Sequence, residues 1–522
     1  MSPYGNSYRQ TLRSWSIMGG AAGLNYLLAL VRIKIVAILL GPSGVGLIGL
    51  YTSAIGLVGT ISSFGIGSSA VREVARAFNE EDARAVARTA RILQRACWAT
   101  GIFGWLLAVL LAKPLSIWLF DSTERAIAIS ILGVTLLLNA LAAGRQALLQ
   151  GLRRIEDVAR ANILGTVLST VVAIGLYAWL GKDGILPVLV TTALISLALA
   201  YWFSRRVRVI ANDVSWEDTI EGTKQLLGLG VAFMLISVTG AAVDTLTRSI
   251  VTNEFGVHAA GIYQAAWALS GTFAGIILAA MATDFYPRLS AVIHDEALAM
   301  RQVNEQIEIG ILMLLPGLVG TLFFAPVIME VVYTRDFVAG AELLRWMVLG
   351  IFSKVLSWPT NFIPIAKGSA RLVIAADALY TSIQIVSLFW MEHMNGLVGV
   401  AQATAAALAL QSLIMLWVGR RLIGFAWSSS VKRLVAISSG YILACFTIPL
   451  LMKGSTAALA GGLVTLTGCI VSWRGLTKRL GSGNLLTEWI ACAWNGWTSV
   501  LQLNVWWRRY SMEVYRKFAR DL

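Results

Sequence analysis

Charged residues are scarce for a chain of this length. Only 13% of the 522 residues are Asp, Glu, Lys or Arg, whereas 57% are hydrophobic and the mean hydropathy is +0.72. A soluble domain carries roughly 25% charged residues. Apolar runs of about 20 residues recur from end to end, each long enough to cross about 30 Å of hydrocarbon as a helix. The composition excludes a large soluble domain and predicts an all-α polytopic membrane protein.

Cysteine and histidine are also scarce, and neither has the spacing of a metal or catalytic site. The four cysteines lie in apolar segments, where a thiol packs as a small apolar side chain: Cys97, Cys445, Cys469 and Cys492. The three histidines lack the paired spacing of a zinc site: His258, His294 and His393. Because phosphate-loop and nucleophile-elbow motifs are absent from the sequence, we expect no cofactor and no enzyme.

Breaks at glycine, proline, charge clusters and polar turns divide the chain into about fourteen expected spans. Their ranges are 15–40, 45–69, 92–112, 126–149, 161–180, 185–203, 226–251, 261–283, 307–333, 343–366, 372–391, 396–418, 434–452 and 455–473.

Lysine and arginine are distributed unevenly between the two sets of loops. If the N-terminus is cytoplasmic, the loops on that side carry 26 of these residues and the opposite loops carry 6. Because short cytoplasmic loops are enriched in Lys and Arg, this asymmetry predicts that both termini are cytoplasmic. The basic cytoplasmic loops also explain the net charge of +14. The expected partner is therefore the lipid bilayer and not a nucleic acid.

A weak internal repeat relates two parts of the sequence. Three glycine junctions recur at offsets of 215, 217 and 215 positions: Gly41 with Gly256, Gly151 with Gly368, and Gly184 with Gly399. Because the repeated block holds six spans, an even number, both copies have the same orientation. In transporters built from such repeats, the substrate site lies between the copies.

This repeat predicts the organisation of the chain. We expect a six-helix N-terminal lobe at 1–204, a cytoplasmic interlobe linker at 205–225, a second six-helix lobe at 226–419 and an extra helix pair at 420–479. The tail at 480–522 holds five tryptophans together with Arg508 and Arg509. Tryptophan combined with arginine is typical of an amphipathic helix lying in the membrane interface, here on the cytoplasmic side.

Seven charged residues inside the expected spans are candidates for a functional site, and the basic ones outnumber the acidic ones. The basic residues are Arg32, Lys34, Arg145, Arg248 and Lys354, and the acidic residues are Asp244 and Asp377. A charge at the bilayer centre costs at least roughly 2.5–3.5 kcal/mol, so such residues usually face a bundle interior or a watery cavity. The excess of cations predicts a path for an anion. We expect the five basic residues to bind an anionic head group and the two aspartates to act in gating or ion coupling.

Structural roles remain open for the charges of the first and seventh spans. Arg32 and Lys34 are two residues apart and lie on different faces of one helix, so one can face a cavity while the other pairs or extends to the interface. Asp244 and Arg248 are four apart and share a face, where they either pair permanently or form a salt bridge that opens during transport.

The other three residues also have two readings each. Arg145 lies near the cytoplasmic end of its span, where a long side chain reaches the interface easily. Lys354 precedes a segment interrupted by Pro359 and Pro364, and broken helices are tolerated where they line a cavity. Asp377 is either the partner of Lys354 or a proton-coupling site.

Six short segments carry a family resemblance. They are KIVAILLGPSGVGL at 34–47, GIG at 65–67, GIYQA at 261–265, YPRLS at 286–290, LRW at 344–346 and IAKG at 365–368. In order and spacing they resemble Wzx-type polysaccharide-lipid flippases, such as the lipid III flippases and O-antigen translocases, over about residues 10–421. These flippases belong to the multidrug/oligosaccharidyl-lipid/polysaccharide exporter superfamily. By position, Lys34 matches the basic residue that precedes their Gly-Pro turn.

The resemblance implies two six-helix lobes in a V-shaped arrangement, around a cavity that opens alternately to each side. It implies a flippase that moves an undecaprenyl-pyrophosphate-linked oligosaccharide from the cytoplasmic to the periplasmic leaflet of the bacterial inner membrane. Such a flippase serves the biosynthesis of O-antigen, lipopolysaccharide or other surface polysaccharide. It also implies a polysaccharide polymerase and a chain-length regulator as partners.

Three alternatives remain at this point. The material after residue 421 departs from a twelve-helix pattern and is compatible with a fourteen-helix lipid II flippase. A cation-coupled multidrug antiporter of the same superfamily would favour an excess of intramembrane carboxylates, the opposite of the balance here. A polysaccharide polymerase or ligase typically needs a large external loop, and the outside loops here have about a dozen residues at most.

Overall fold

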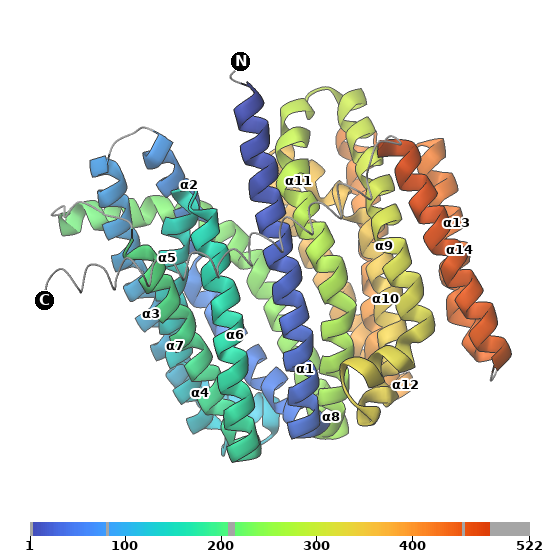
Figure 1. Cartoon of the computed structure of the whole chain (residues 1–522), viewed down its shortest axis with the longest axis horizontal. Helices are drawn as coiled ribbons and strands as arrows, with labels where there is room; N and C mark the ends of the chain where they lie inside the picture. Colours follow the sequence, from blue (N-terminus) through green and yellow to red (C-terminus); the bar gives the residue numbers. More distant parts are fainter. Residues whose placement is uncertain (1–3, 80–82, 207–213, 452–454, 481–522) are drawn as a thin grey trace, which may run out of the picture.

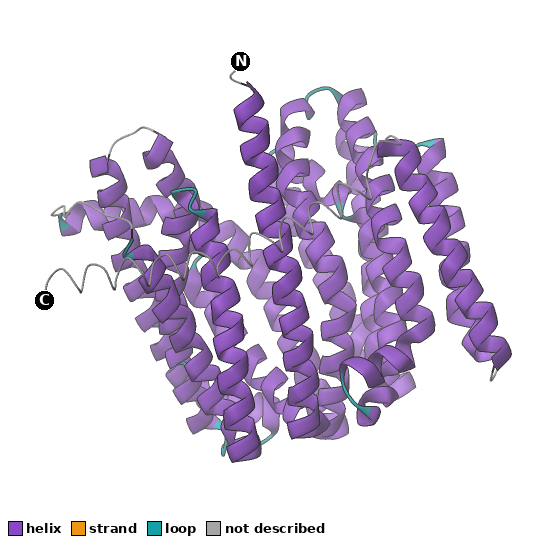
Figure 2. Cartoon of the chain, viewed as in Figure 1, coloured by secondary structure: helices purple, strands orange, loops and turns teal. Residues whose placement is uncertain are grey.

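The computed structural model describes residues 4–79, 83–206, 214–451 and 455–480, which are helical almost throughout and contain no strand (Figure 2). Part of the predicted linker, 207–213, and the predicted interfacial tail beyond residue 480 lie outside the described residues. The all-α fold expected from composition is confirmed.

The helices run side by side as one elongated bundle (Figure 1). We refer to α1–α7 as the N-terminal half and to α8–α12 as the C-terminal half. The N-terminal half contains α1 (Tyr4–Ser63), α2 (Ile66–Asn79), α3 (Ala83–Phe120), α4 (Ala126–Leu132), α5 (Val134–Gly151), α6 (Ile155–Leu180), the 3₁₀ turn η1 (Gly181–Gly184) and α7 (Ile185–Ser204). The C-terminal half contains α8 (Trp216–Val292), α9 (Glu296–Val332), η2 (Arg335–Gly340), α10 (Ala341–Ser357), η3 (Pro359–Asn361), α11 (Phe362–Ala366) and α12 (Ala370–Ile423). Two further helices follow, α13 (Ser429–Leu451) and α14 (Ser455–Leu480).

Three of these helices contain a break and therefore supply two membrane crossings each. The backbone leaves helical geometry at Gly41 in α1, at Gly256 in α8 and at Gly396 in α12. Eight helical stretches of the described residues are long and apolar enough to span a membrane, and three of them contain two crossings, on either side of Gly41, Gly181 and Gly396. With both legs of α8 and the interrupted α10–α11 segment, the described chain agrees with the fourteen predicted spans.

The glycine breaks all lie at one end of the bundle, which we call the turn end. Figure 1 shows it at the bottom, whereas the N-terminus lies at the top, at the end that we call the linker end because α7 ends and α8 begins there. Glycine tolerates the left-handed φ that these breaks require, and other residues are strained there. The break positions in the sequence therefore mark where the chain reverses.

Left-handed backbone positions recur with one spacing along the chain. Three pairs are each separated by 215 positions: Gly41 (φ 63°) with Gly256 (φ 81°), Arg153 (φ 57°) with Gly368 (φ 70°), and Gly181 (φ 58°) with Gly396 (φ 57°). Helices α4 and α10 also begin 215 positions apart, at Ala126 and Ala341. This backbone periodicity supports the proposal of two six-helix halves with the same orientation.

Packing separates the interior into distinct apolar cores. The largest buried cluster is built mainly by α8–α13, with only Ala37 and Val45 contributed by α1. A second cluster lies entirely within α1–α7 and includes Tyr51, Ile129 and Ile185. The extra helices α13 and α14 pack against α9. Each half therefore has its own core, and α1 and α8 join the halves along an extensive contact.

Helix α8 begins at Trp216, inside the polar segment 205–225 that the sequence predicted to be a linker. The Ser215 hydroxyl accepts a hydrogen bond from the Asp218 amide (3.0 Å), as a helix N-cap does. A hydrogen bond with Ser215 and the charge of Arg88 lower the pKa of the Asp218 carboxyl. Arg95 of α3 donates to the Val214 carbonyl (2.9 Å) and stacks on Trp216 at 4.5 Å. The start of α8 is thereby anchored to the N-terminal half.

Candidate functional site

Four of the predicted intramembrane charges meet within the C-terminal half. Asp244 and Arg248 lie on the first leg of α8, Lys354 lies on α10 and Asp377 lies on α12. Helix α8 contacts both α10 and α12, and α10 contacts α12. Lys354 is thirteen residues from the start of α10 and twelve from the end of α11, which places it about 20 Å from the turn end. The cluster therefore lies at the middle of the span.

Asp244 and Arg248 form the ion pair that their spacing predicts. Arg248 Nη1 lies 3.9 Å from Asp244 Oδ2 and also donates to the Asp244 carbonyl at 3.0 Å. The Arg248 side chain is only 12% exposed, whereas 43% of the Asp244 side chain is accessible. Arg248 Nε donates to Gln264 Oε1 at 3.0 Å. The arginine is thus held by three acceptors, while the aspartate also faces open space.

Lys354 is the least constrained charge of this cluster. Its side chain is exposed although it lies at mid-span, and the hydrogen bonds of the described residues include none from its ammonium group. Its electrostatic partner is the Asp244 carboxylate on the neighbouring helix. Asp244 therefore stands between two cations, Arg248 and Lys354, and Lys354 retains the capacity to bind another anion.

Asp377 lies on the linker side of this group. Its Oδ2 accepts a hydrogen bond from the Thr239 hydroxyl at 2.9 Å, which ties α12 to α8. The Tyr380 phenol, one turn further along α12, lies close enough to interact electrostatically with Asp377 and with Asp244. The two acids are consequently connected through neutral polar side chains. The electrostatic partner of Lys354 is therefore Asp244, and Asp377 pairs with a hydroxyl instead.

Neutral polar residues complete the cluster, and sequence reasoning did not single them out as site residues. Gln264 accepts from Arg248, Thr239 donates to Asp377, and Tyr380 interacts electrostatically with both acids. The amide of Gln264 inside an apolar span could have indicated it, because a polar group in lipid requires a hydrogen-bond partner. Gln264 belongs to the GIYQA segment at 261–265. Its side chain packs against Gly49 of α1, where an added Cβ would lie 3.0 Å from the Gln264 amide.

Lys34 contacts the opposite half of the molecule. Its ammonium donates to the Glu330 carbonyl at 2.8 Å and to the Tyr333 carbonyl, at the C-terminal end of α9. The last carbonyls of a helix lack intrahelical partners and carry partial negative charge, so they are suitable acceptors for a cation. Lys34 therefore joins α1 to α9 near the turn end.

Further contacts close the two halves against each other from mid-span to the turn end. Ser53 of α1 and Thr245 of α8 share a hydrogen bond of 2.9 Å. The Trp118 carbonyl of α3 accepts hydrogen bonds from Ser249 and from Asn253 (3.2 Å) of α8. Gly261 approaches α1 so closely that an added Cβ would overlap the Pro42 carbonyl oxygen. These contacts describe a conformation that is closed between the halves at the turn end.

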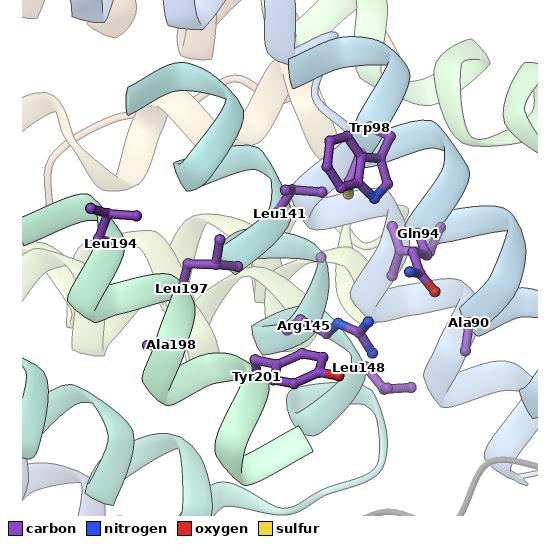
Figure 3. A pocket seen from close by; sticks show the side chains of 13 residues that line it. Ala90, Gln94, Trp98, Leu141, Arg145, Leu148, Leu194, Leu197, Ala198 and Tyr201 are labelled. Carbon is purple, nitrogen blue, oxygen red and sulfur yellow. The ribbon is translucent and has the colours of Figure 1, made fainter. Parts of the chain in front are cut away.

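The remaining two cations lie within the N-terminal half. Arg32 is half-buried on α1, close to the phenol of Tyr177 on α6. Arg145 of α5 lines a cavity of about 410 Å³ between α3, α5 and α7, where its guanidinium lies 5.2 Å from the centre of the Tyr201 ring (Figure 3). The side chains that line this cavity with Arg145 all belong to the N-terminal half. The structure therefore does not bring Arg145 into the Asp244–Lys354 cluster.

Comparisons with known proteins agree with the resemblance seen in the short segments. Residues 35–341 match the model of a family described as polysaccharide biosynthesis protein. A lipid III flippase of Escherichia coli K12 is 24% identical over 392 residues, which cover 72% of this chain and 89% of the relative. A putative O-antigen transporter of Shigella flexneri is 22% identical over 422 residues, which cover 78% of this chain and 97% of the relative. The predicted resemblance is confirmed, and both relatives carry the names of transporters rather than of enzymes.

Two solved transporter structures share the fold. The lipid II flippase MurJ in an inward closed conformation superposes with a TM-score of 0.64 at 16% identity, covering 87% of this chain and 98% of that chain. An inward-facing multidrug transporter of the MATE family, in the MOP superfamily, gives a TM-score of 0.60 at 15% identity, covering 78% of this chain and 96% of that chain. At these identities the likeness concerns the fold alone.

Proposed function

Because this chain belongs to the polysaccharide biosynthesis protein family that its residues 35–341 match, we propose that it is a flippase for a lipid-linked oligosaccharide. The observation that carries this proposal is the match to a lipid III flippase over 89% of that relative's length. The alignment of 392 residues is longer than either half of this chain, so it includes parts of both halves. The substrate class follows from the relative's name. The intramembrane cations of this chain could bind the anionic head group of such a substrate.

The finer proposal is that the cargo is an undecaprenyl-pyrophosphate-linked oligosaccharide, moved from the cytoplasmic to the periplasmic leaflet of the bacterial inner membrane. A pyrophosphate is a strong anion, and Arg and Lys are its natural partners in proteins. The excess of intramembrane cations supports this cargo, because it provides positive charge at depths where each such charge is costly. The polar oligosaccharide would cross between the halves while the prenyl chain remains in lipid.

Orientation and partners belong to the same proposal. The 26-to-6 asymmetry of Lys and Arg supports cytoplasmic termini, and the linker end then faces the cytoplasm. A polysaccharide polymerase and a chain-length regulator are the proposed partners, because a flipped oligosaccharide lipid is a precursor for polymerisation. Labelling of a cysteine at exposed Lys182, in the 3₁₀ turn at the turn end, tests the orientation: a membrane-impermeant reagent should reach it only from the periplasm.

We assign the head group to the mid-span cluster and to the α1 cations. In the closed arrangement Lys354 interacts with Asp244, and an incoming pyrophosphate competes with that carboxylate for the same ammonium. Release of Asp244 from Lys354 then changes the charge between α8 and α10. Arg32 and Arg248 stay proposed head-group residues, whereas Arg145, predicted with them, lies in the flank cavity instead. Asp244 and Asp377 stay proposed gating or coupling acids.

Transport also requires the contacts at the turn end to open. Lys34 must leave the α9 carbonyls, and the Ser53–Thr245 hydrogen bond, which lies nearer mid-span, must break as well. An anion that pairs with Lys34 replaces the hydrogen bonds lost from the carbonyls. Lys34 is therefore proposed both to close the turn end and to bind the head group when that end opens, which is the behaviour alternating access needs.

The direct test is leaflet transfer of a fluorescent prenyl-pyrophosphate oligosaccharide by the reconstituted protein. We expect Lys354→Ala and Arg248→Ala to lower the transfer rate about tenfold or more, the loss of one charged hydrogen bond in a low-dielectric site. Lys182→Ala, an exposed lysine at the turn end, is the matched control and should transfer normally. Normal transfer by both cluster variants, with the control also normal, would remove the head-group role.

Two observations favour a second candidate function enough to include it in the test. The described chain agrees with fourteen spans, and the structural likeness to the lipid II flippase covers 98% of that chain. The cluster also holds two acids that a cation-coupled multidrug antiporter would use. A lipid II analogue and a cationic dye should therefore be assayed beside the prenyl-pyrophosphate oligosaccharide. Preferential movement of either would assign the alternative function.

A further inference from the structure

A cavity opens on the flank of the N-terminal half, away from the ionic cluster of the C-terminal half. It lies between α3, α5 and α7 and has a volume of about 410 Å³. Figure 1 shows these three helices on the side of the bundle opposite α13 and α14. The lining is mainly apolar, with Leu141, Leu194 and Leu197 around the opening and the guanidinium of Arg145 at its linker-end side (Figure 3). The cavity combines an apolar slot with one cation.

A second cation contacts the same aromatic ring. The Tyr201 ring centre lies 5.2 Å from the Arg145 guanidinium and 5.5 Å from that of Arg205. The ion pairs of the described residues include no carboxylate within 4.0 Å of either arginine. Two guanidinium groups without an acidic partner, beside an aromatic ring, form a site that suits a phosphate group.

The depth of this site corresponds to the boundary between head groups and acyl chains. Arg145 is six residues from the end of α5 at Gly151, which is about 9 Å along the helix axis. Tyr201 is three residues from the end of α7, and Arg205 directly follows that helix. Aromatic and basic side chains at this depth anchor to lipid head groups. The apolar slot beyond them lies where an acyl chain would be.

The flank beside this cavity is open. The Cys97 side chain is buried against Gly144 of α5, where an added Cβ would lie 2.6 Å from its sulfur, but Trp98 and Leu194 are 45% and 46% exposed. A shift of 215 positions relates Cys97 to Leu312 of α9, and there α14 lies alongside, because Ser472 donates to the Leu312 carbonyl. In the N-terminal half, apolar side chains beside the cavity are thus left open to lipid.

We propose that this cavity binds an anionic phospholipid of the linker-end leaflet, with its phosphate on Arg145 and Arg205 and one acyl chain between α3 and α7. Charge complementarity selects an anionic head group, and the apolar lining selects a lipid over free phosphate. The site requires only a membrane, so it does not depend on the transported cargo.

The test is lipid binding to the delipidated, full-length protein, measured by native mass spectrometry during titration with single lipids. Phosphatidylglycerol should bind at least about fivefold more tightly than phosphatidylcholine, because each basic side chain near the phosphate is worth on the order of 1 kcal/mol. Arg145→Gln should reduce this preference about fivefold. The matched control is Arg421→Gln, since Arg421 stacks on the exposed Trp417 at 5.2 Å at the same end of the bundle and does not line this cavity. It should bind as the wild type does.

Two more variants keep the result interpretable if Arg145→Gln unfolds. Arg205→Gln removes the second cation from a surface position, and Leu197→Trp fills the slot while leaving both cations in place. Each should weaken phosphatidylglycerol binding. Equal binding of the two phospholipids by the wild type, or unchanged binding in folded variants, would overturn the proposal. Displacement of phosphatidylglycerol by a short polyprenyl diphosphate at lower concentration would assign the cavity to the carried lipid instead. Because binding is measured without transport, these outcomes are independent of the flippase assay.

Discussion

The two halves of this protein carry their intramembrane charges in different ways. The C-terminal half holds two acids and two bases that interact with one another: Asp244, Asp377, Arg248 and Lys354. The N-terminal half holds three bases and no expected intramembrane acid: Arg32, Lys34 and Arg145. A balanced set is stable without a ligand, whereas unbalanced cations need carbonyls, aromatic rings or an incoming anion. Lys34 accordingly contacts backbone carbonyls of α9, and Arg145 contacts an aromatic ring.

The repeat shows that this difference lies in the side chains rather than in the scaffold. A shift of 215 positions turns Asp377 into Asn162 and Lys354 into Asn139. In the other direction, Arg32 and Lys34 become Thr247 and Ser249. The turn positions coincide in both halves, yet each charged position is neutral in the other half. One backbone plan therefore supports two different electrostatic roles.

The largest expected effect comes from breaking the balance in the C-terminal half. Asp244→Asn leaves Arg248 and Lys354 facing each other without the carboxylate between them. We expect leaflet transfer to fall more than tenfold and unfolding free energy to fall by about 1–3 kcal/mol, less than for a fully buried pair because Asp244 is half-exposed. Transfer assays and chemical denaturation in detergent measure the two effects.

Asp244→Glu is the control for this prediction, since it keeps the charge and changes only the reach of the side chain. It should retain most of the stability. Wild-type transfer by Asp244→Asn would show that the charge balance of the C-terminal half is irrelevant to transport.

The next effect concerns the N-terminal cation that joins the two halves. Lys34→Met removes the hydrogen bonds to the Glu330 and Tyr333 carbonyls and should weaken closure of the turn end by about 1.5–3 kcal/mol. Closure is measured by disulfide cross-linking of cysteines placed at Ser53 and Thr245, in a background without the native cysteines. We expect slower cross-linking in Lys34→Met.

Lys113→Met is the matched control, because Lys113 is an exposed lysine on α3 in the last third of that helix, toward the turn end. Its cross-linking rate should equal that of the parent. If Lys34→Met also cross-links at the parent rate, the bond to α9 does not hold the halves together.

A smaller effect should sharpen the account of how Arg248 is held. Gln264→Leu removes the acceptor of the Arg248 Nε hydrogen bond but leaves the bonds to Asp244. We expect a loss of about 1 kcal/mol in unfolding free energy and a decrease in transfer of about fivefold. The control Gln150→Leu changes an exposed glutamine at the end of α5. Equal effects of the two substitutions would argue against a role for Gln264 in positioning Arg248.

A final pair of substitutions tests whether the scaffold is the same in both halves. Gly181→Ala and Gly396→Ala place a Cβ at φ 58° and 57° and should each destabilise the protein by about 1–2 kcal/mol. The helical control Gly175→Ala, which has open space around its Cβ, should be neutral or stabilising. Thermal unfolding in detergent measures all three. Unequal costs at Gly181 and Gly396 would show that the two turns are not equivalent.

Much of the fold follows from the sequence, because lipid imposes one simple requirement on every span. Apolar length sets the crossings, and glycine sets the reversals at Gly41 and Gly256. The spacing of Asp244 and Arg248 likewise predicts a pair on one helical face, and the structure places them 3.9 Å apart. Local periodicity is enough for each of these features.

Contacts between helices distant in sequence did not follow in the same way. Lys34 finds backbone carbonyls of α9, and any helix end offers such acceptors, so no residue type marks them in the sequence. Gln264 as a partner of Arg248 and the flank position of Arg145 depend on how the helices pack. An ion pair needs two charged residues, whereas amides, hydroxyls and aromatic rings are also partners of the charged side chains here.

The most direct test of the central claim compares substrates rather than variants. The reconstituted protein should transfer a fluorescent prenyl-pyrophosphate oligosaccharide between leaflets and leave the same oligosaccharide on an uncharged prenol essentially in place. Such discrimination is what intramembrane cations predict for an anionic head group. Equal transfer of the two lipids would contradict the account, because the cations would then have no part in recognising the cargo.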